Sequence, residues 1–359
     1  MPLERCLQRY GRDVVSMSGK SICHVNAASL PAELRGLARD SVSLLTLDLK
    51  DNSVSLGTFR NDIGRLLKAG DLMVFNDSRM ISASFSAYFR EVGSFGRINL
   101  GTNRNRDLFL AEPRPRSLNP RLKPGYQFTI AGSAALFTVM ARHSKFPRYW
   151  WVQGRKDVDR LLSEGMHAVP IRYGYIPFQI PIDYYSSLFS SVPGSVEYPC
   201  ASRPFTQEII EHLRSKGVRI ATLTLHCNLG SLEPQEFEIA GGLIEEYYNI
   251  PGKTLDIIES TQQKGGRIIA AGTTVTRAIE SAFAEHGRVK PSGWTDIFIK
   301  PGYELKVVDG LITGIHDAES SHLSMVGAFS GTRIARYVQE VACEKGLLQH
   351  EFGDSMMVM

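Results

Sequence analysis

Strand and helix patterns alternate regularly from Pro199 onwards, and this alternation is the strongest constraint on the fold. Hydrophobic spacing predicts three helices, each followed by a strand: helix 206–216 with strand 218–226, helix 255–264 with strand 267–271, and helix 274–286 with strand 295–299. Helices that connect neighbouring strands make a sheet mostly parallel and cover its faces. The sequence therefore predicts an α/β body, a mostly parallel sheet with flanking helices.

Four shorter segments near the N-terminus extend this body. Alternating and apolar runs predict a hairpin with strands at 44–48 and 54–57, joined by a polar turn around Asp51. Residues 62–68 have helical apolar spacing that stops at a glycine, and an apolar strand follows at 72–75.

The pattern changes between residues 84 and 155. Short apolar or alternating runs, broken by Gly, Pro and Asn, favour a small antiparallel β-barrel. We therefore expect a barrel domain at 84–155 inserted into a discontinuous α/β domain at 30–83 and 156–359. A short helix is expected at 157–165, after the barrel. Residues 1–29 show no sustained periodicity and are expected to be a loosely ordered extension.

Composition narrows the class of protein. The sequence has no apolar run of about 18 residues and no signal-peptide pattern, so we expect no membrane span. Its five cysteines have no CxxC spacing, which suggests neither a disulfide framework nor a zinc site and fits the cytoplasm. Residues 88–160 hold 14 Lys and Arg against 5 Asp and Glu, although the net charge of the whole chain is only +4. This basic module could attract a phosphate-bearing partner, or it could simply be a solvated face.

Three segments could carry chemistry. Gly272-Thr273-Thr274 joins a buried strand to a helix that contains Arg277, and such a turn offers backbone N–H groups to a carboxylate, phosphate or ribose. It could equally be an ordinary helix cap. Asn76-Asp77-Ser78-Arg79 follows the strand at 72–75, where it could bind a nucleoside or an amino acid, or form an Asx turn with an Asp–Arg pair.

Three further residues are candidate acids or bases. His226 closes the strand at 218–226, where side chains of open α/β sheets reach towards ligands. Asp296 and His316 lie in a segment that reads as strand, Pro-Gly turn, strand, turn, strand, and they meet only if those strands are neighbours. No His or Cys residues have the spacing of metal ligands, so we expect no metal.

These blocks, taken in order, resemble the S-adenosylmethionine:tRNA ribosyltransferase-isomerase (QueA-like) family of queuosine biosynthesis. The similarity runs from about Leu30 to the C-terminus. It is carried by 70–79, Thr224-Leu225-His226, the Gly-Thr-Thr helix with Glu280-Ser281-Ala282, 295–303, 308–313 and 352–356. The resemblance implies an α/β body with an inserted barrel. It also implies transfer and isomerisation of the ribosyl part of S-adenosylmethionine onto 7-aminomethyl-7-deazaguanine in a tRNA anticodon, with release of adenine and methionine.

The chain departs from the family pattern at several positions. Pro204, Gly241 and Ile244 stand where the family has histidines, Cys200 replaces a threonine, and His322 is new. Imidazole titrates near neutral pH, so these losses suggest that the substrate or the reaction has changed. We therefore interpret the chain as a diverged relative that uses S-adenosylmethionine as co-substrate, alone or with a small-molecule acceptor. The family's own tRNA reaction, which yields epoxyqueuosine, is one alternative, and a non-catalytic relative that binds cofactor or nucleic acid is another.

The resemblance assigns roles to the candidate residues. Those expected to bind S-adenosylmethionine are Asn76, Asp77, Arg79, Gly272, Thr273, Thr274 and Arg277. Those expected to act as acids or bases are His226, Asp296 and His316.

Overall fold

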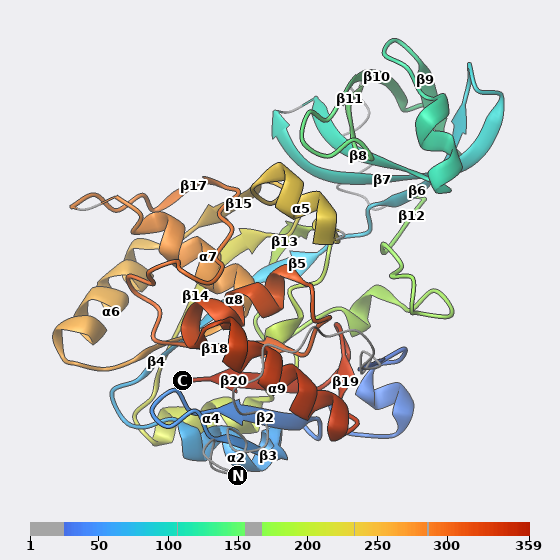
Figure 1. Cartoon of the computed structure of the whole chain (residues 1–359). Coiled ribbons are helices and arrows are strands. Elements are labelled where there is room, and N and C mark those ends of the chain that lie inside the picture. The colour runs from blue at the N-terminus through green and yellow to red at the C-terminus, as the bar shows by residue number, and fades with distance from the viewer. Residues whose placement is uncertain (1–24, 106, 155–166, 233, 286) are drawn as a thin grey trace, which may run out of the picture.

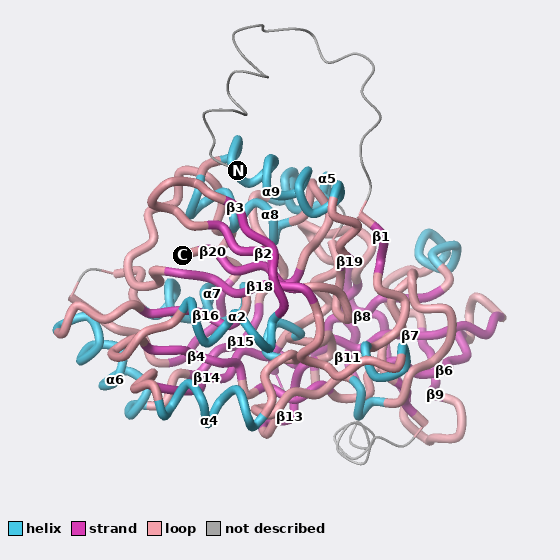
Figure 2. The backbone as a smooth tube through the Cα atoms, turned by 90° about the horizontal axis from the view of Figure 1, so that it is seen from below, coloured by secondary structure: helices cyan, strands magenta, loops and turns pink. Residues whose placement is uncertain are grey.

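A computed structural model describes residues 25–105, 107–154, 167–232, 234–285 and 287–359. Two bodies are visible: a large body that contains both ends of the described chain, and a β-barrel that projects from it at the upper right of Figure 1. In Figure 2 the strands of the large sheet lie inside the body, with helices on its outside.

Among the described residues, nine strands form the main sheet of the body, in the order β17-β15-β14-β4-β16-β18-β20-β2-β3. The central four, β14, β4, β16 and β18, are parallel neighbours. On one side β15 and β17 are antiparallel to their neighbours. On the other side β20 is antiparallel to β18 and parallel to β2, and β3 is antiparallel to β2. The strands are β2 (Ser43–Leu47), β3 (Val54–Thr58), β4 (Leu72–Asn76), β14 (Arg219–His226), β15 (Glu246–Asn249), β16 (Ile268–Ala271), β17 (Ser292–Thr295), β18 (Gly310–Gly314) and β20 (Ser355–Val358).

Apolar side chains on both faces of these strands explain why the sheet is buried. In β4, Met73 and Phe75 face one apolar cluster while Leu72 and Val74 face another, because successive side chains of a strand point to opposite faces. Helices α2 and α4 cover the first cluster, α6 and α7 the second, and α8 and α9 the edge near β20. The helices are α2 (Phe59–Leu66), α4 (Gln207–Ser215), α5 (Pro234–Ala240), α6 (Gly252–Gln263), α7 (Thr273–Ala282), α8 (Ser321–Ser330) and α9 (Thr332–Glu344).

The barrel is a sheet closed by pairing of its first strand with β9. Its interior is a separate apolar cluster in which Phe128 and Phe137 stack with ring centroids 5.0 Å apart. The barrel strands are β6 (Ser84–Phe89), β7 (Ser94–Asn105), β8 (Leu108–Arg114), β9 (Gln127–Ile130), β10 (Leu136–Arg142) and β11 (Trp150–Gly154), and β12 (Ala168–Val169) pairs with β6 on the return to the body.

Hydrogen bonds from the loop after β14 hold the barrel against the body. Asn228 Oδ1 accepts from Thr102 N at 3.0 Å, and a Cβ on Gly101 would lie only 2.3 Å from that same oxygen. Glycine is therefore required where β7 approaches the loop. From the other barrel edge, Tyr149 Oη donates to Leu229 O at 2.8 Å.

The described part of the body also contains two small two-stranded sheets. β5 (Ser78–Met80) pairs with β13 (Val192–Ser195), and β1 (Asn26–Ala27) pairs with β19 (Leu348–Gln349). Strand β1 falls within the segment predicted to be a loose extension; the rest of that segment up to residue 24, and the helix expected at 157–165, lie outside the described residues.

The predicted architecture, an α/β body with an inserted antiparallel barrel, is confirmed. The strand expected at 295–299 is wrong: β17 ends at Thr295, and the strands expected after the Pro-Gly turn reduce to β18. The reason is that the Arg277 guanidinium donates hydrogen bonds to the backbone carbonyls of Thr295 and Ile297, at 3.3 and 3.1 Å. These carbonyls are therefore not available to a neighbouring strand. Among the described residues, no helix combines the length and apolar character needed to cross a membrane.

Glu280 of α7 fixes the loop that precedes β18, and this yields a stability prediction. Its carboxylate is fully buried and accepts from the backbone N–H groups of residues 306, 307 and 308 at 2.9–3.0 Å. Glu280→Gln would point an amide at these donors, so we expect a loss of about 3 kcal/mol in unfolding free energy. Urea denaturation measures it. The exposed Glu259→Gln on α6 should change stability by no more than about 0.5 kcal/mol, and equal effects of the two variants would contradict this account.

Candidate active site

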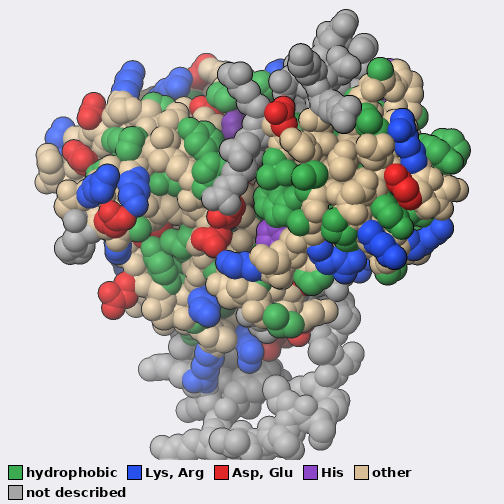
Figure 3. All heavy atoms as spheres, turned by 90° about the horizontal axis from the view of Figure 1, so that it is seen from above, with side chains coloured by type: hydrophobic (Ala, Val, Ile, Leu, Met, Phe, Trp, Pro, Cys, Tyr) green, Lys and Arg blue, Asp and Glu red, His purple; other side chains and the backbone are tan. Residues whose placement is uncertain are grey.

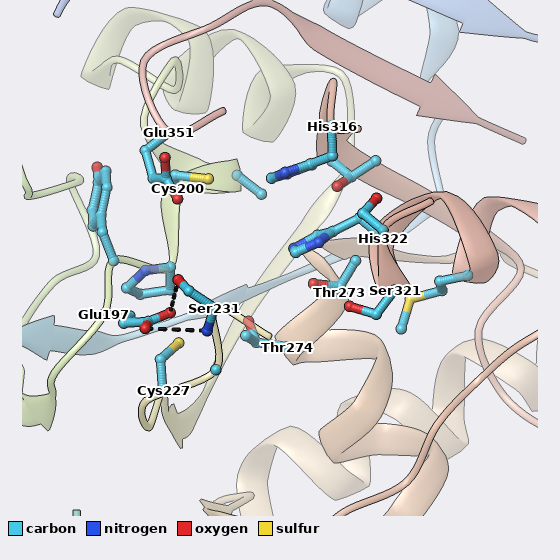
Figure 4. Close-up of a pocket in the computed structure, with 18 of the residues that line it drawn as sticks. Glu197, Cys200, Cys227, Ser231, Thr273, Thr274, His316, Ser321, His322 and Glu351 are labelled. Atoms are coloured by element: carbon cyan, nitrogen blue, oxygen red, sulfur yellow. Dashed lines mark hydrogen bonds between the residues drawn. The ribbon is translucent and has the colours of Figure 1, made fainter. Parts of the chain in front are cut away.

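A cavity of about 360 Å³, here called the inner cavity, lies beyond the carboxyl ends of β14, β16 and β18. Ligands bind at this edge of open α/β sheets because the strand-to-helix turns converge there. Figure 4 shows side chains from several segments of the body pointing into it, among them Glu197, His316 and Glu351. Its lining includes Tyr173, Glu197, Cys200, Cys227, Ser231, Ile244, Glu246, Gly272, Thr273, Thr274, Arg277, His316, His322, His350 and Glu351.

The Gly-Thr-Thr turn forms one wall of the inner cavity. Gly272 has φ 118°, a conformation that side chains other than hydrogen rarely allow, and α7 begins directly after it at Thr273. Thr274 Oγ1 accepts from Asn76 Nδ2 at 3.2 Å, which ties the turn to the end of β4. The free N–H groups of the first helical turn favour a negatively charged or polar ligand group at this wall.

Arg277 lies one turn further along α7 and is committed to the protein itself. Its guanidinium pairs with Glu246, the first residue of β15, and both side chains are almost fully buried. The other oxygen of Glu246 accepts from Asn228 N at 2.9 Å. Arg277 therefore supports the cavity wall, and its bonds to Glu246 and to backbone carbonyls leave it little capacity for a ligand carboxylate.

Two stacked histidines line the inner cavity beside this turn. The rings of His316, just beyond β18, and His322, in the first turn of α8, stack with centroids 3.7 Å apart and planes 14° apart. Burial lowers the pKa of His322 to about 4 and holds the pKa of His316 well below its usual range. Both imidazoles are therefore neutral at physiological pH and offer one donor and one acceptor each.

Two carboxyl groups of the inner cavity have pKa values near neutrality. Burial raises the pKa of Glu197 to about 7, and burial raises that of Glu351 to about 7 as well. Glu197 accepts from Ser231 N at 3.2 Å and Ser231 Oγ at 3.0 Å, the bonds drawn as dashed lines in Figure 4. Glu351 Oε2 is buried without a hydrogen-bond partner among the described residues. A carboxyl group in this state can exchange a proton or pair with a cation.

The two thiols of the inner cavity are protonated. Burial raises the pKa of Cys200 to about 11 and that of Cys227 well above its usual range. Since the thiolate is the nucleophilic form, neither cysteine is suited to covalent catalysis in this state.

The structure brings together only part of the predicted set. Gly272, Thr273, Thr274, Arg277 and His316 all line the inner cavity. The other predicted residues, Asn76, Asp77, Arg79, His226 and Asp296, are not among its lining residues.

Each of these five residues has another environment. Asn76 is buried and bonded to Leu225 and Ser78, and Asp77 accepts from Thr224 Oγ1 at 2.6 Å. Arg79 is exposed on β5. The half-exposed Asp296 pairs with Lys145 of the barrel at 3.5 Å, because the chain leaves the sheet at Thr295. His226 lies on the opposite side of the β14 end, with its Nδ1 2.7 Å from Ser78 Oγ.

Sequence reasoning missed Glu197, Glu351, Ser231 and His350 in the inner cavity. Glu197 and Glu351 occupy irregular segments without periodicity, so nothing local indicates that they point inwards. His322 carries a signal, since it stands out as an added histidine six residues after His316. Within the ranges that the structure describes, no group of three or more His, Cys, Asp or Glu side chains could hold a metal ion.

The raised pKa of Glu197 predicts a pH-dependent stability. The carboxyl titrates near 4.5 when unfolded and at about 7 when folded, so the folded state loses stability as pH rises through that window and no further above it. Glu197→Gln lacks this loss. The unfolding free energy of the variant minus that of wild type should therefore rise by roughly 2 kcal/mol between pH 4.5 and pH 7.5, allowing for partial exposure. Denaturation at several pH values tests this, with exposed Glu208→Gln as the matched substitution; a pH-independent difference would refute it.

Comparisons with known proteins agree with this architecture. A family model described as queuosine biosynthesis protein matches residues 24–358. A curated S-adenosylmethionine:tRNA ribosyltransferase-isomerase from Acetivibrio thermocellus is 32% identical over 346 residues, covering 92% of this chain and 95% of that protein. One of the same name from a Thermoanaerobacter species is 32% identical and covers 89% and 94% of the two chains.

A solved structure extends the similarity to the fold. The crystal structure of an S-adenosylmethionine tRNA ribosyltransferase from Thermotoga maritima matches 93% of this chain and 96% of its own, with a TM-score of 0.52 and 26% identity. The family match spans both the sheet that carries the inner cavity and the inserted barrel. This chain therefore belongs to the queuosine biosynthesis protein family.

Proposed function

We propose that this protein is an S-adenosylmethionine:tRNA ribosyltransferase-isomerase. In this reaction the ribosyl part of S-adenosylmethionine is transferred to a 7-aminomethyl-7-deazaguanine base of tRNA and isomerised, and adenine and methionine leave. The observation that carries the proposal is the inner cavity, walled by the Gly-Thr-Thr turn, in a chain whose family match covers residues 24–358. The curated relatives carry this activity in their names.

The inner cavity offers groups for each part of S-adenosylmethionine. The N-terminus of α7, with Thr273 and Thr274, suits the methionine carboxylate or the ribose hydroxyls. Glu197 and Glu351 can pair with the sulfonium or the amino group, because a nearby cation favours ionisation of a buried carboxyl. The flat stack of His316 and His322 offers a surface for the adenine ring together with hydrogen bonds to its nitrogens.

The reaction also needs a base and a proton donor. Removal of the acidified proton beside the sulfonium requires an unprotonated base, and departure of adenine requires a proton. We assign the base to His316, which burial keeps unprotonated, and the proton donor to whichever of Glu197 and Glu351 does not pair with a cationic group of the substrate, since both exchange protons near pH 7. Asp296, exposed and paired with Lys145, has no part in this assignment.

The basic barrel supports a polyanionic substrate. Residues 88–160 carry 14 Lys and Arg against 5 Asp and Glu, and Figure 3 shows Lys and Arg side chains gathered on the barrel side of the molecule. Phosphate contacts release counterions, so binding through this surface would weaken steeply with salt. A small-molecule acceptor would need no such surface. The basic barrel therefore favours tRNA over a small molecule as the acceptor.

The substrate assignment predicts a product. The full chain, incubated with S-adenosylmethionine and a tRNA that carries 7-aminomethyl-7-deazaguanine, should release adenine and methionine in equal amounts. The modified nucleoside should gain the ribosyl-derived mass in digests followed by mass spectrometry. A tRNA with guanine at that position is the control and should give no product. Release of adenine without any tRNA, or with a small acceptor only, would contradict this assignment. It would instead support a diverged enzyme that acts on S-adenosylmethionine alone or with a small-molecule acceptor, as Ile244 and Cys200 in the cavity wall suggest.

The role of His316 predicts a selective kinetic defect. We expect His316→Gln to lower kcat by about 100-fold or more, since a general base contributes about that much, whereas loss of its ring from the adenine surface should weaken S-adenosylmethionine affinity, measured by calorimetry, by no more than about tenfold. His212→Gln, at an exposed position on α4, should retain full activity. If His316→Gln keeps wild-type kcat, His316 is not the base. If wild-type protein binds the cofactor and tRNA but forms no product, the chain is a non-catalytic relative.

A further inference from the structure

Three aromatic rings form a row across the end of the main sheet, on the face opposite the inner cavity. His226 of β14 is the register partner of Tyr247 of β15, which in turn is the register partner of Trp294 of β17. The ring centroids are 6.5 Å apart for the first pair and 5.7 Å for the second. All three side chains remain partly exposed, so the row is an aromatic surface rather than part of a core.

This row is one wall of a second pocket, here called the junction pocket, of about 470 Å³. The opposite wall comes from the barrel strands β7 and β8, through residues 100–102 and Phe109. Apolar side chains, among them Ile81 and Val196, complete the lining. Apolar walls with a few polar groups are typical of pockets for small organic ligands.

Two polar atoms in the junction pocket have unused hydrogen-bonding capacity. Thr102 Oγ1 is buried, and His226 Nε2 is likewise without a hydrogen-bond partner among the residues that the structure describes. Burial without a partner is costly, so rotation of the Thr102 side chain that brings its hydroxyl to a polar ligand atom in the pocket would be favoured. The imidazole is fixed by Ser78 at Nδ1 and by Gly194, where a Cβ would lie 2.5 Å from the ring.

The junction pocket and the inner cavity are separated by a single layer of backbone. At three places, two consecutive residues point into different pockets, one into each. The pairs, with the junction-pocket residue first and the inner-cavity residue second, are Val196 and Glu197, His226 and Cys227, and Tyr247 and Glu246. This division follows from the alternation of side chains along extended chain. A ligand in one pocket is therefore close to a ligand in the other without sharing its contacts.

We propose that the junction pocket binds a nucleobase stacked on the Tyr247–Trp294 row. Aromatic rows on sheet faces bind unpaired bases of RNA, and every base has a flat face that can stack on them. The exposed Arg79 of β5 is the register partner of Pro193, which lines the pocket, and has no carboxylate partner within the described ranges, so it suits the attached phosphate. If the proposed function holds, the base belongs to a tRNA nucleotide near the reacting one.

Calorimetric titration of the full chain with three ligands tests this. The ligands are an unstructured RNA heptamer, adenosine 5′-monophosphate and ribose 5-phosphate, which lacks a base. We expect base-dependent binding, with Tyr247→Ala and Trp294→Ala each weakening it about tenfold or more and Trp294→Phe retaining it. Phe178→Ala, at an exposed aromatic position outside the pocket, is the matched control and should bind as wild type does.

The ligands distinguish the source of the base. Binding of the heptamer but not of the mononucleotide assigns the pocket to RNA, and equal binding assigns it to a free nucleotide. Absence of binding by both, binding of ribose 5-phosphate as tight as that of the nucleotides, or unchanged affinity in both alanine variants would overturn the proposal. Thr102→Val replaces the hydroxyl with a methyl group of similar size. It should also weaken binding, and it provides the test if an alanine variant fails to fold.

Binding of S-adenosylmethionine separates this proposal from the proposed function. The junction-pocket variants should keep wild-type affinity for S-adenosylmethionine, because the inner cavity lies on the other side of the strand ends. If wild-type protein binds nucleobases but not S-adenosylmethionine, the proposed function fails and the junction pocket stands. The reverse result leaves the function intact and removes the nucleobase site.

Discussion

The buried pair between Glu246 and Arg277 is the interaction on which the other parts of the site depend. Through Arg277 it holds the first turns of α7 and draws the backbone around residues 295–297 out of the sheet. Through its second oxygen, Glu246 holds Asn228, and Asn228 in turn binds the barrel at Thr102. Removal of either charge would leave the other buried and unpaired, which proteins tolerate poorly. One carboxylate thus sets the relative positions of helix, sheet and barrel.

Much of the scaffold could be predicted because its signals are local. The apolar strand β4, the amphipathic α4 and the strand, Gly-Thr-Thr and helix sequence around Gly272 each follow from the spacing of residues close together in the chain. The strand expected at 295–299 failed because Arg277, about 20 residues away, removes the carbonyls that a sheet neighbour would use. Glu197 and Glu351 could not be predicted either, since their pKa values depend on burial by distant segments. His226 was singled out correctly as a strand-end residue, but which face it occupies depends on register.

The altered family positions have a clearer meaning in the folded chain. Ile244 and Cys200 both line the inner cavity, so these replacements change its surface directly. His322, the added histidine, stacks on His316 in the same cavity. Against the family pattern that the resemblance gives, one imidazole of this wall is absent, at Ile244, and one is added, at His322. The two glutamates contribute groups that titrate near pH 7. Groups able to donate and accept protons near neutral pH are therefore present in the cavity.

The missing side chain at Gly101 has a consequence for how the barrel can move. Because the backbone of β7 sits within hydrogen-bonding distance of Asn228, with no space for even a methyl group, the barrel rests directly on the loop that follows β14. This contact sets the closest approach of the barrel to the body, and the bonds from Tyr149 to Leu229 and from Lys145 to Asp296 hold the barrel at further points. A side chain added at Gly101 would therefore have to displace the barrel from the loop against all of these contacts at once.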